Sequence, residues 1–119
     1  MKRDSVLSLV GIAKKADRVV SGEFQTETAI KSDRASLVMI SLEASGNTRK
    51  KFQNMSSFYK IRAYLYGSRE ELGAASGTGF RAVLAVTDDG LANAIESKLI
   101  QAGAQRVDGN VSDTGNEEI

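Results

Sequence analysis

Three short apolar runs constrain most strongly how this chain can fold: SLVMISL at Ser36–Leu42, IRAYLY at Ile61–Tyr66 and FRAVLAV at Phe80–Val86. They are nearly continuous rather than alternating, which is typical of strands that are covered by helices on both faces. Helix-length segments lie before, between and after them. Strands that alternate with helices predict an α/β fold, a three-layer α/β/α sandwich with a mixed sheet.

The expected helices begin at polar capping residues. Ser68 and Glu71 form an S-x-x-E capping box, and Gly103 is a helix stop. The predicted helices span about residues 5–16, 22–31, 45–60, 68–76 and 88–102, and a short strand is expected at 18–20. The length of 119 residues suits one domain.

The missing residue types narrow the chemistry. The chain has no cysteine and no histidine, so disulfides, thiolate catalysis and the commonest metal ligand are excluded. No apolar run approaches the ~20 residues that cross a bilayer. The basic and apolar start MKRDSVLSLVGIAKKA is interrupted by charges and a glycine, so we interpret it as an amphipathic helix, not a signal peptide. We expect a cytoplasmic protein with no membrane partner, no metal and no cofactor.

The charge is unevenly distributed along the chain. Residues 1–103 carry 15 Lys+Arg against 11 Asp+Glu, whereas residues 104–119 carry one against four. A mildly basic body suits an anionic partner. The last segment is polar, acidic and glycine-containing. We therefore predict one domain at 1–103 and a disordered acidic tail at 104–119.

Candidate catalytic features are few. Asp88 and Asp89 follow an apolar strand and could form an acidic site, but they also suit a helix N-cap. Gly77-Thr78-Gly79 has glycines of a phosphate loop without its lysine or its following helix, and it equally suits a turn into the next strand. We expect no enzyme activity, and a nucleotide-handling enzyme remains an alternative.

The segment EASGNTRKKF is the best sequence support for a nucleic-acid partner. Ser45 or Asn47 can cap a helix, and Arg49, Lys50 and Lys51 then occupy its early turns. Cations there oppose the helix dipole by roughly 0.3–1 kcal/mol each, but they would act together with free N–H groups on a bound anion. A solvated basic face is the other interpretation.

Four segments in order carry a family resemblance: VLSLVGIAKKADRVVSGE, LEASGNTRKKF, YLYGSREELGAASG and FRAVLAVTDDGLANAI. Together they resemble the bacterial YlxQ-like ribosomal proteins, relatives of the kink-turn-binding proteins of the L-seven-Ae and L-thirty-e type. The resemblance covers about residues 4–103, and the run S-R-E-E-L-G-x-A-x-G is its most specific part. It implies an α/β/α sandwich with a four-stranded mixed sheet, no catalysis, and RNA as the ligand.

The resemblance also implies where the RNA binds: the start of the second helix, the loop after the second strand and the loop before the L-G helix. The glycine of strong kink-turn binders matches Gly22, their Asn-Glu pair falls on Phe24 and Gln25, and their Lys falls on Thr28. Gln25 offers a donor and an acceptor to a base edge, and Phe24 could stack on an unpaired base.

The predicted function is therefore an RNA-binding ribosomal or ribosome-associated protein that recognises structured, kink-turn-like RNA. The alternative is a protein-interaction module on the same fold that has lost strong kink-turn binding. The predicted RNA-binding residues are Gly22, Phe24, Gln25, Thr28, Lys31, Glu43, Asn47, Arg49, Lys50, Tyr66, Gly67 and Ser68.

Overall fold

The computed structural model describes residues 4–109. They form, in chain order, α1 Ser5–Lys15, β1 Val19–Ser21, α2 Glu23–Lys31, β2 Leu37–Ile40, α3 Gly46–Tyr59, β3 Arg62–Leu65, α4 Arg69–Ala75, β4 Val83–Val86, α5 Asp89–Gln101 and β5 Gln105–Arg106.

The strands form one mixed sheet in the order β1-β4-β2-β3-β5. β2 and β3 are parallel, and β4 runs antiparallel to both β1 and β2. At one end of the sheet Ile40 lies opposite Val83 and Leu65, and Ser21 lies opposite Leu84. That end therefore gathers the last residues of β1, β2 and β3 and the first residues of β4.

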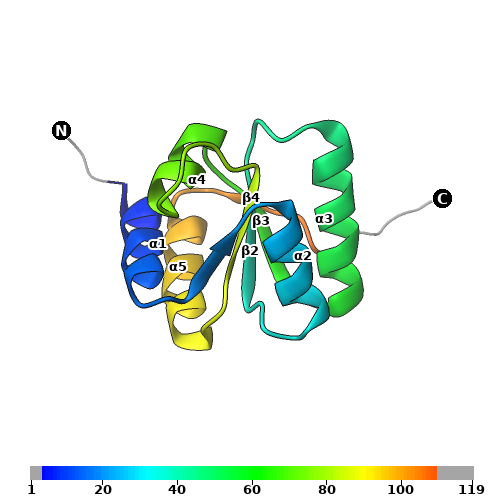
Figure 1. Cartoon of the computed structure of the whole chain (residues 1–119), viewed down its shortest axis with the longest axis horizontal. Helices are drawn as coiled ribbons and strands as arrows, with labels where there is room; N and C mark the ends of the chain where they lie inside the picture. Colours follow the sequence, from blue (N-terminus) through cyan, green and yellow to red (C-terminus); the bar gives the residue numbers. More distant parts are fainter. Residues whose placement is uncertain (1–3, 110–119) are drawn as a thin grey trace.

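Helices cover both faces of the sheet, as Figure 1 shows: α1, α4 and α5 lie on one side, and α2 and α3 on the other. In β2, Leu37 and Met39 belong to the core beneath α1 and α5, whereas Val38 and Ile40 belong to the core beneath α2 and α3. Because both faces are buried, both sets of alternating side chains must be apolar. This explains the continuous apolar runs, and the predicted three-layer α/β/α sandwich is confirmed.

Local capping explains where four of the helices begin. The side chains of Asp4, Ser45 and Asp88 accept hydrogen bonds from backbone N–H groups in the first turns of α1, α3 and α5. The expected capping box is present at α4, where Ser68 and Glu71 each bond the other's backbone N–H. Each cap satisfies donors that a helix start leaves without partners.

The sheet has five strands within residues 4–109, so the prediction of four strands is wrong by one. The fifth strand lies within residues 104–109, so the prediction of disorder from residue 104 is wrong for these residues. β5 pairs antiparallel with β3, and the buried Val107 donates its N–H to the carbonyl of Ala63. Asp108 accepts the Ala63 N–H at 2.9 Å and pairs with Arg106 at 2.8 Å. The contacts with β3 join distant parts of the chain, so the two exposed polar residues of β5 carry no local sign of a strand. The rest of the predicted tail, residues 110–119, lies outside the described residues.

Between residues 4 and 109, no helix has the length and the apolar character needed to cross a membrane.

Candidate functional site

Three helices begin at the end of the sheet where β1, β2 and β3 finish. α2 follows β1, α3 follows β2, α4 follows β3, and the loop from α4 enters β4 beside them. We call this the glycine end and define it by Gly22–Gln25, Ser41–Lys50, Gly67–Arg69 and Thr78–Ala82. Figure 1 shows the starts of α3 and α4 above the same end of the sheet.

Hydrogen bonds hold the loops of the glycine end together. The Gly67 carbonyl accepts both the N–H of Leu42 at 2.9 Å and the hydroxyl of Ser41 at 3.0 Å. A carboxylate oxygen of Glu43 accepts the N–H of Arg69 at 3.0 Å. Because Gly67 has φ +80°, a conformation that L side chains rarely adopt, glycine is favoured at this crossing. The loops after β2 and β3 therefore form one connected surface.

The start of α2 differs from the other helix starts. Gly22 is its N-cap residue with φ +90° and ψ 161°, and no side chain caps it, in contrast to the other four helices of residues 4–109. The Gly22 N–H is bound to the Val83 carbonyl at 2.9 Å. An uncapped first turn leaves N–H groups for solvent or for a bound anion.

Arg81 covers the Gly22 backbone. Its Nε atom donates to the hydroxyl of Ser21 at 3.1 Å, and a guanidinium nitrogen donates to the carbonyl of Phe80 at 3.0 Å. A Cβ atom at position 22 would lie 3.4 Å from Nε of Arg81. The loop before β4 thus supplies a cation directly beside the α2 start.

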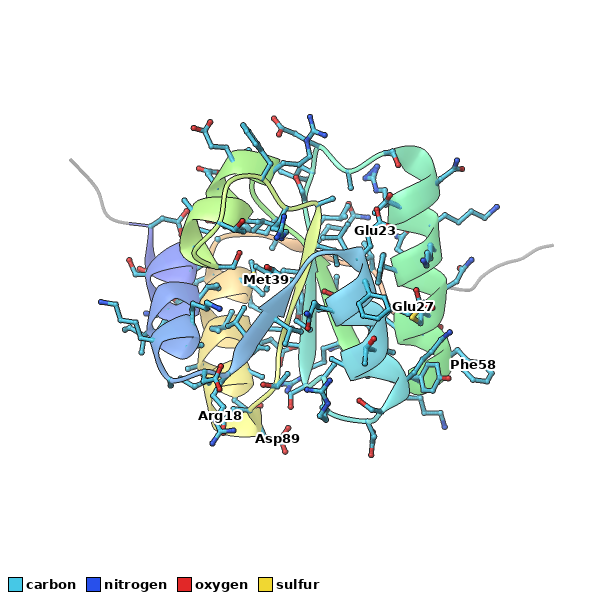
Figure 2. The ribbon with its side chains drawn as sticks, viewed as in Figure 1. Arg18, Glu23, Glu27, Met39, Phe58 and Asp89 are labelled. Carbon is cyan, nitrogen blue, oxygen red and sulfur yellow. The ribbon has the colours of Figure 1, made fainter. Side chains whose placement is uncertain are left out.

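A short network joins α2 to α3. The hydroxyl of Thr48 donates to Glu23 at 3.0 Å, and Ser45 Oγ accepts the Thr48 N–H at 3.1 Å. Glu23 lies at the end of α2 that faces the start of α3 in Figure 2. The network fixes the two helix starts relative to each other.

Gly73 explains the L-G pair of the α4 segment. A Cβ atom there would lie 2.1 Å from the carbonyl oxygen of Gly79 and 2.8 Å from the nitrogen of Phe80. No real side chain tolerates that approach, so a glycine is required. Its absence of a side chain lets the Gly79-Phe80 backbone lie directly on α4.

Large apolar side chains are exposed on the glycine end. The exposed fractions are 80% for Phe24, 66% for Phe80 and 62% for Leu42. They come from α2, from the loop before β4 and from the loop after β2, which the contacts above bring together. Large apolar side chains that are exposed at one end of a domain are typical of a binding surface.

The cations on and beside this end differ in whether a carboxylate pairs with them. Within residues 4–109, no carboxylate lies at ion-pairing distance from Arg49 or Lys50. Lys31 and Lys51 both bind Glu27, at 2.8 and 2.9 Å. Hydrogen bonds from Lys31 and then from Lys51 lower the pKa of Glu27 to about 2. Arg49 and Lys50 are thus the cations of α3 most available to an anion.

Most of the predicted residues lie at the glycine end, and Thr28 lies one turn further along α2, where its hydroxyl donates to the Phe24 carbonyl. Those at the glycine end are Gly22, Phe24, Gln25, Glu43, Asn47, Arg49, Lys50, Gly67 and Ser68. The Ser68 side chain is occupied as the α4 cap.

The remaining two predicted residues, Lys31 and Tyr66, lie apart from the others. Lys31 is the last residue of α2, at the far end of the helix from Gly22. Tyr66 packs against the core on the α1 and α5 side, and its hydroxyl donates to Asp4 at 2.6 Å. Burial and then this bond to Asp4 raise the pKa of Tyr66 to about 12. Strand alternation places this half-buried ring on the face of the sheet that α1 and α5 cover, and a contact of Tyr66 with RNA stays a prediction.

Phe80, Arg81 and Thr48 also belong to this site, although they were not among the predicted residues. Phe80 and Arg81 were assigned to a strand, but β4 begins only at Val83. The charged Arg81 inside an apolar run was the available signal. No local signal marks Thr48, because its partner Glu23 is 25 positions away.

In the part of the chain that the structure describes, no three His, Cys, Asp or Glu residues are grouped to hold a metal ion.

Comparison with known proteins identifies a family and several relatives. Residues 4–96 match the ribosomal protein L7Ae/L30e/S12e/Gadd45 family. The chain is 42% identical over 91 residues to the RNA-binding protein YlxQ of Bacillus subtilis (strain 168), covering 76% of this chain and 91% of that protein. It is 31% identical over 90 residues to the protein of the same name from Enterococcus faecium, covering 76% and 86%.

Two solved structures share the fold. A protein of unknown function from Bacillus halodurans superposes with a TM-score of 0.79 at 31% identity, covering 82% of this chain and 99% of that one. The Giardia lamblia 15.5kD RNA binding protein superposes with a TM-score of 0.67 at 17% identity, covering 83% and 85%.

Proposed function

Because the chain belongs to the ribosomal protein L7Ae/L30e/S12e/Gadd45 family, we propose that it binds structured, kink-turn-like RNA through its glycine end. The YlxQ relatives that it resembles over most of their length are named as RNA-binding proteins. Their similarity supports RNA as the class of ligand. The arrangement of residues in this chain indicates which surface would bind the RNA and by which contacts.

One observation carries the proposal: an uncapped helix start, exposed aromatic rings and cations occur together at the glycine end. α2 has no side-chain cap, Phe24 is exposed beside that start, and Arg81 lies over Gly22. A phosphate would satisfy the free N–H groups of α2 and would be attracted by Arg81. An unpaired base would find an exposed aromatic face.

The contacts divide into two kinds. Arg49 and Lys50 would bind phosphates, which position an RNA without reading its sequence. Phe24 and Phe80 would stack on bases that a bend leaves unpaired, and the Gln25 amide would bond a base edge. A regular duplex offers no such bases. The surface therefore favours bent or bulged RNA over a plain helix.

We propose binding rather than catalysis, and we expect the RNA to be ribosomal in origin. Asp88, the candidate acidic residue of the sequence, caps α5 through the Leu91 N–H at 2.8 Å. Crosslinking in cells followed by sequencing of the bound RNA tests the ribosomal origin. Reads that fall outside ribosomal RNA would refute that part of the proposal.

The exposed apolar side chains also favour a second candidate, a protein-interaction module on the same fold. Phe24, Leu42 and Phe80 could pack against a protein partner as well as against bases. This alternative predicts no difference between bent and straight RNA.

The test is a competition gel shift at one stated salt concentration, with a kink-turn RNA and a plain duplex of equal length. We expect the kink-turn RNA to bind about tenfold more tightly. Phe24→Ala should remove most of this preference, since base stacking on an aromatic side chain is worth roughly 1–3 kcal/mol. Ile12→Ala, an exposed apolar residue of α1, is the matched control and should not change it. Equal affinity of the unaltered protein for both RNAs would favour the protein-interaction module.

A further inference from the structure

We propose that the outer face of α3 is a second RNA-binding surface, which holds an unpaired strand leaving the RNA bound at the glycine end. The inference rests on the RNA binding proposed above and adds a site to it. We call this surface the α3 platform and define it by Lys50, Asn54, Ser57, Phe58 and Tyr59.

The charge of α3 suits an anionic partner. Gly46–Tyr59 contains Arg49, Lys50 and Lys51 and no carboxylate, and Lys60 follows it. Lys51 is paired with Glu27, whereas none of residues 4–109 pairs with Lys50 or Lys60. A helix that served only to cover the core would gain from carboxylates in its first turn, and α3 has none there.

The far half of α3 carries an exposed aromatic pair. Phe58 is 78% exposed, and the centroid of its ring lies 5.0 Å from that of Tyr59 in an edge-to-face arrangement. Figure 2 shows Phe58 at the far end of α3 from the side near Glu23. The edge-to-face contact restrains both rings before any ligand binds. An aromatic face presented to solvent is suited to stacking on an unpaired base.

A polar groove lies along the same helix. It has a volume of about 560 Å³ and is lined by Gln53, Asn54, Ser57, Gln105, Arg106, Val107 and Gly109. Its side-chain amides offer both donors and acceptors, as base edges require. Arg106 is matched by Asp108 and Glu96, so Lys50 and Lys60 supply the charge for phosphates.

The position of α3 connects this surface to the glycine end. The helix begins at Gly46 beside Glu23 and runs away from that end to Tyr59. Lys50, Asn54 and Phe58 follow one another at intervals of four residues, so they lie along one stripe of the helix. The stripe from Lys50 to Phe58 extends about 12 Å at 1.5 Å per residue. An RNA anchored at the glycine end can therefore continue along α3 without leaving the protein surface.

The test compares three RNA probes on the full chain: a kink-turn RNA with blunt ends, and the same RNA with a short oligouridine strand added at its 5′ or its 3′ end. We expect one of the two extensions to tighten binding about fivefold or more, as base stacking on an aromatic ring predicts. Phe58→Ala should abolish this gain while changing the affinity for the blunt RNA by less than about twofold. Ile100→Ala, an exposed apolar residue of α5, is the control and should retain the gain.

A second pair of variants tests the charge of the surface. Asn54→Glu places a carboxylate on the α3 platform and should also abolish the gain, whereas Ser97→Glu on α5 should not. If neither extension brought a gain, or if the gain survived both Phe58→Ala and Asn54→Glu, the inference would be overturned. A gain that depends on Phe58 without any preference of the protein for bent RNA over duplex would support the α3 platform and refute the proposed shape recognition.

Discussion

The two ends of the sheet are built from similar loops but present different surfaces. At the glycine end, the loops cross through Gly67 and pack through Gly73, and three large apolar side chains are exposed. The opposite end, which we call the aspartate end, has a polar groove of about 590 Å³ lined by Asp17, Arg18, Asp33, Arg34, Ser36, Thr87, Asp88 and Asp89. Figure 2 shows Arg18 and Asp89 at this end.

Charge separates the two ends. The lining of the aspartate end carries four carboxylates and two guanidinium groups and no large apolar side chain. At the glycine end, Glu23 and Glu43 already accept hydrogen bonds from Thr48 and Arg69. An RNA phosphate would therefore be repelled at the aspartate end and accepted at the glycine end.

The two ends also differ in which residues adopt unusual backbone conformations in their turns. Asp17 and Asp33 take the left-handed conformation, with φ +61° and +62°, where glycine could equally serve. Aspartate tolerates this conformation better than most residues do. At Gly73 no other residue fits, because the neighbouring backbone is in the way. A glycine is therefore required where two chain segments approach closely, as at Gly73, and this close approach positions the loop before β4 at the candidate site.

We expect the largest effect from a substitution that disrupts only the glycine end. Gly73→Ala would place a Cβ atom 2.1 Å from the Gly79 carbonyl oxygen, so the loop before β4 must move. Overpacking of this kind costs roughly 1–3 kcal/mol. We expect that loss of unfolding free energy in urea denaturation, together with weaker RNA binding.

The matched control for this change is Gly11→Ala in α1, where nothing lies within 4 Å of the new Cβ atom. That variant should gain about 0.5–1 kcal/mol from the better helix propensity of alanine. If Gly73→Ala were as stable as the unaltered protein, the close packing of the loop on α4 would not support the glycine end.

A pair of arginine variants sharpens the contrast in binding. Arg81 at the glycine end and Arg34 at the aspartate end each donate through Nε to a serine hydroxyl, at 3.1 and 3.0 Å. Arg81→Ala should weaken kink-turn RNA binding about threefold to tenfold and reduce the slope of log K against log salt by about 0.7–0.9, the value for one phosphate contact. Arg34→Ala should change affinity by less than about twofold. Equal effects of the two variants in a salt titration would mean that net charge, not the glycine end, determines binding.

The smallest expected effect tests whether the contrast is local or reflects overall charge. Removal of residues 110–119 deletes Asp113, Glu117 and Glu118 and raises the formal net charge from +1 to 16 − 12 = +4. We expect about twofold tighter RNA binding at low salt, fading as salt screens the charges. The melting transition should not change, because β5 and Val107 are retained.

Truncation after Gly103 is the informative comparison for this variant. It removes β5 and the contacts of Val107 and Asp108 with Ala63, so it should lower the melting temperature. If both truncated chains melted like the full chain, β5 would not belong to the stable domain.

Much of the fold could be predicted because its causes are local. The apolar run Leu37–Ile40 indicated a strand buried on both faces, and the pair Ser68 and Glu71 indicated the start of α4. In each case the residues that determine the element lie within it or within one helical turn. The family match and the relatives confirm the family resemblance. It could be predicted because its motifs are contiguous in the chain.

What the sequence by itself determined, therefore, is the succession of helices and strands, the two-sided burial of the sheet and the family. Only the tertiary structure decided that Tyr66 turns toward Asp4, that Lys51 pairs with Glu27, and that Arg81 covers Gly22. Tyr66 and Arg81 meet partners about 60 positions away. Lys31 lies within four residues of Glu27, but the second ion pair from Lys51 depends on how α2 and α3 pack. Such pairings follow from the packing of whole elements, and no local pattern of residues encodes them.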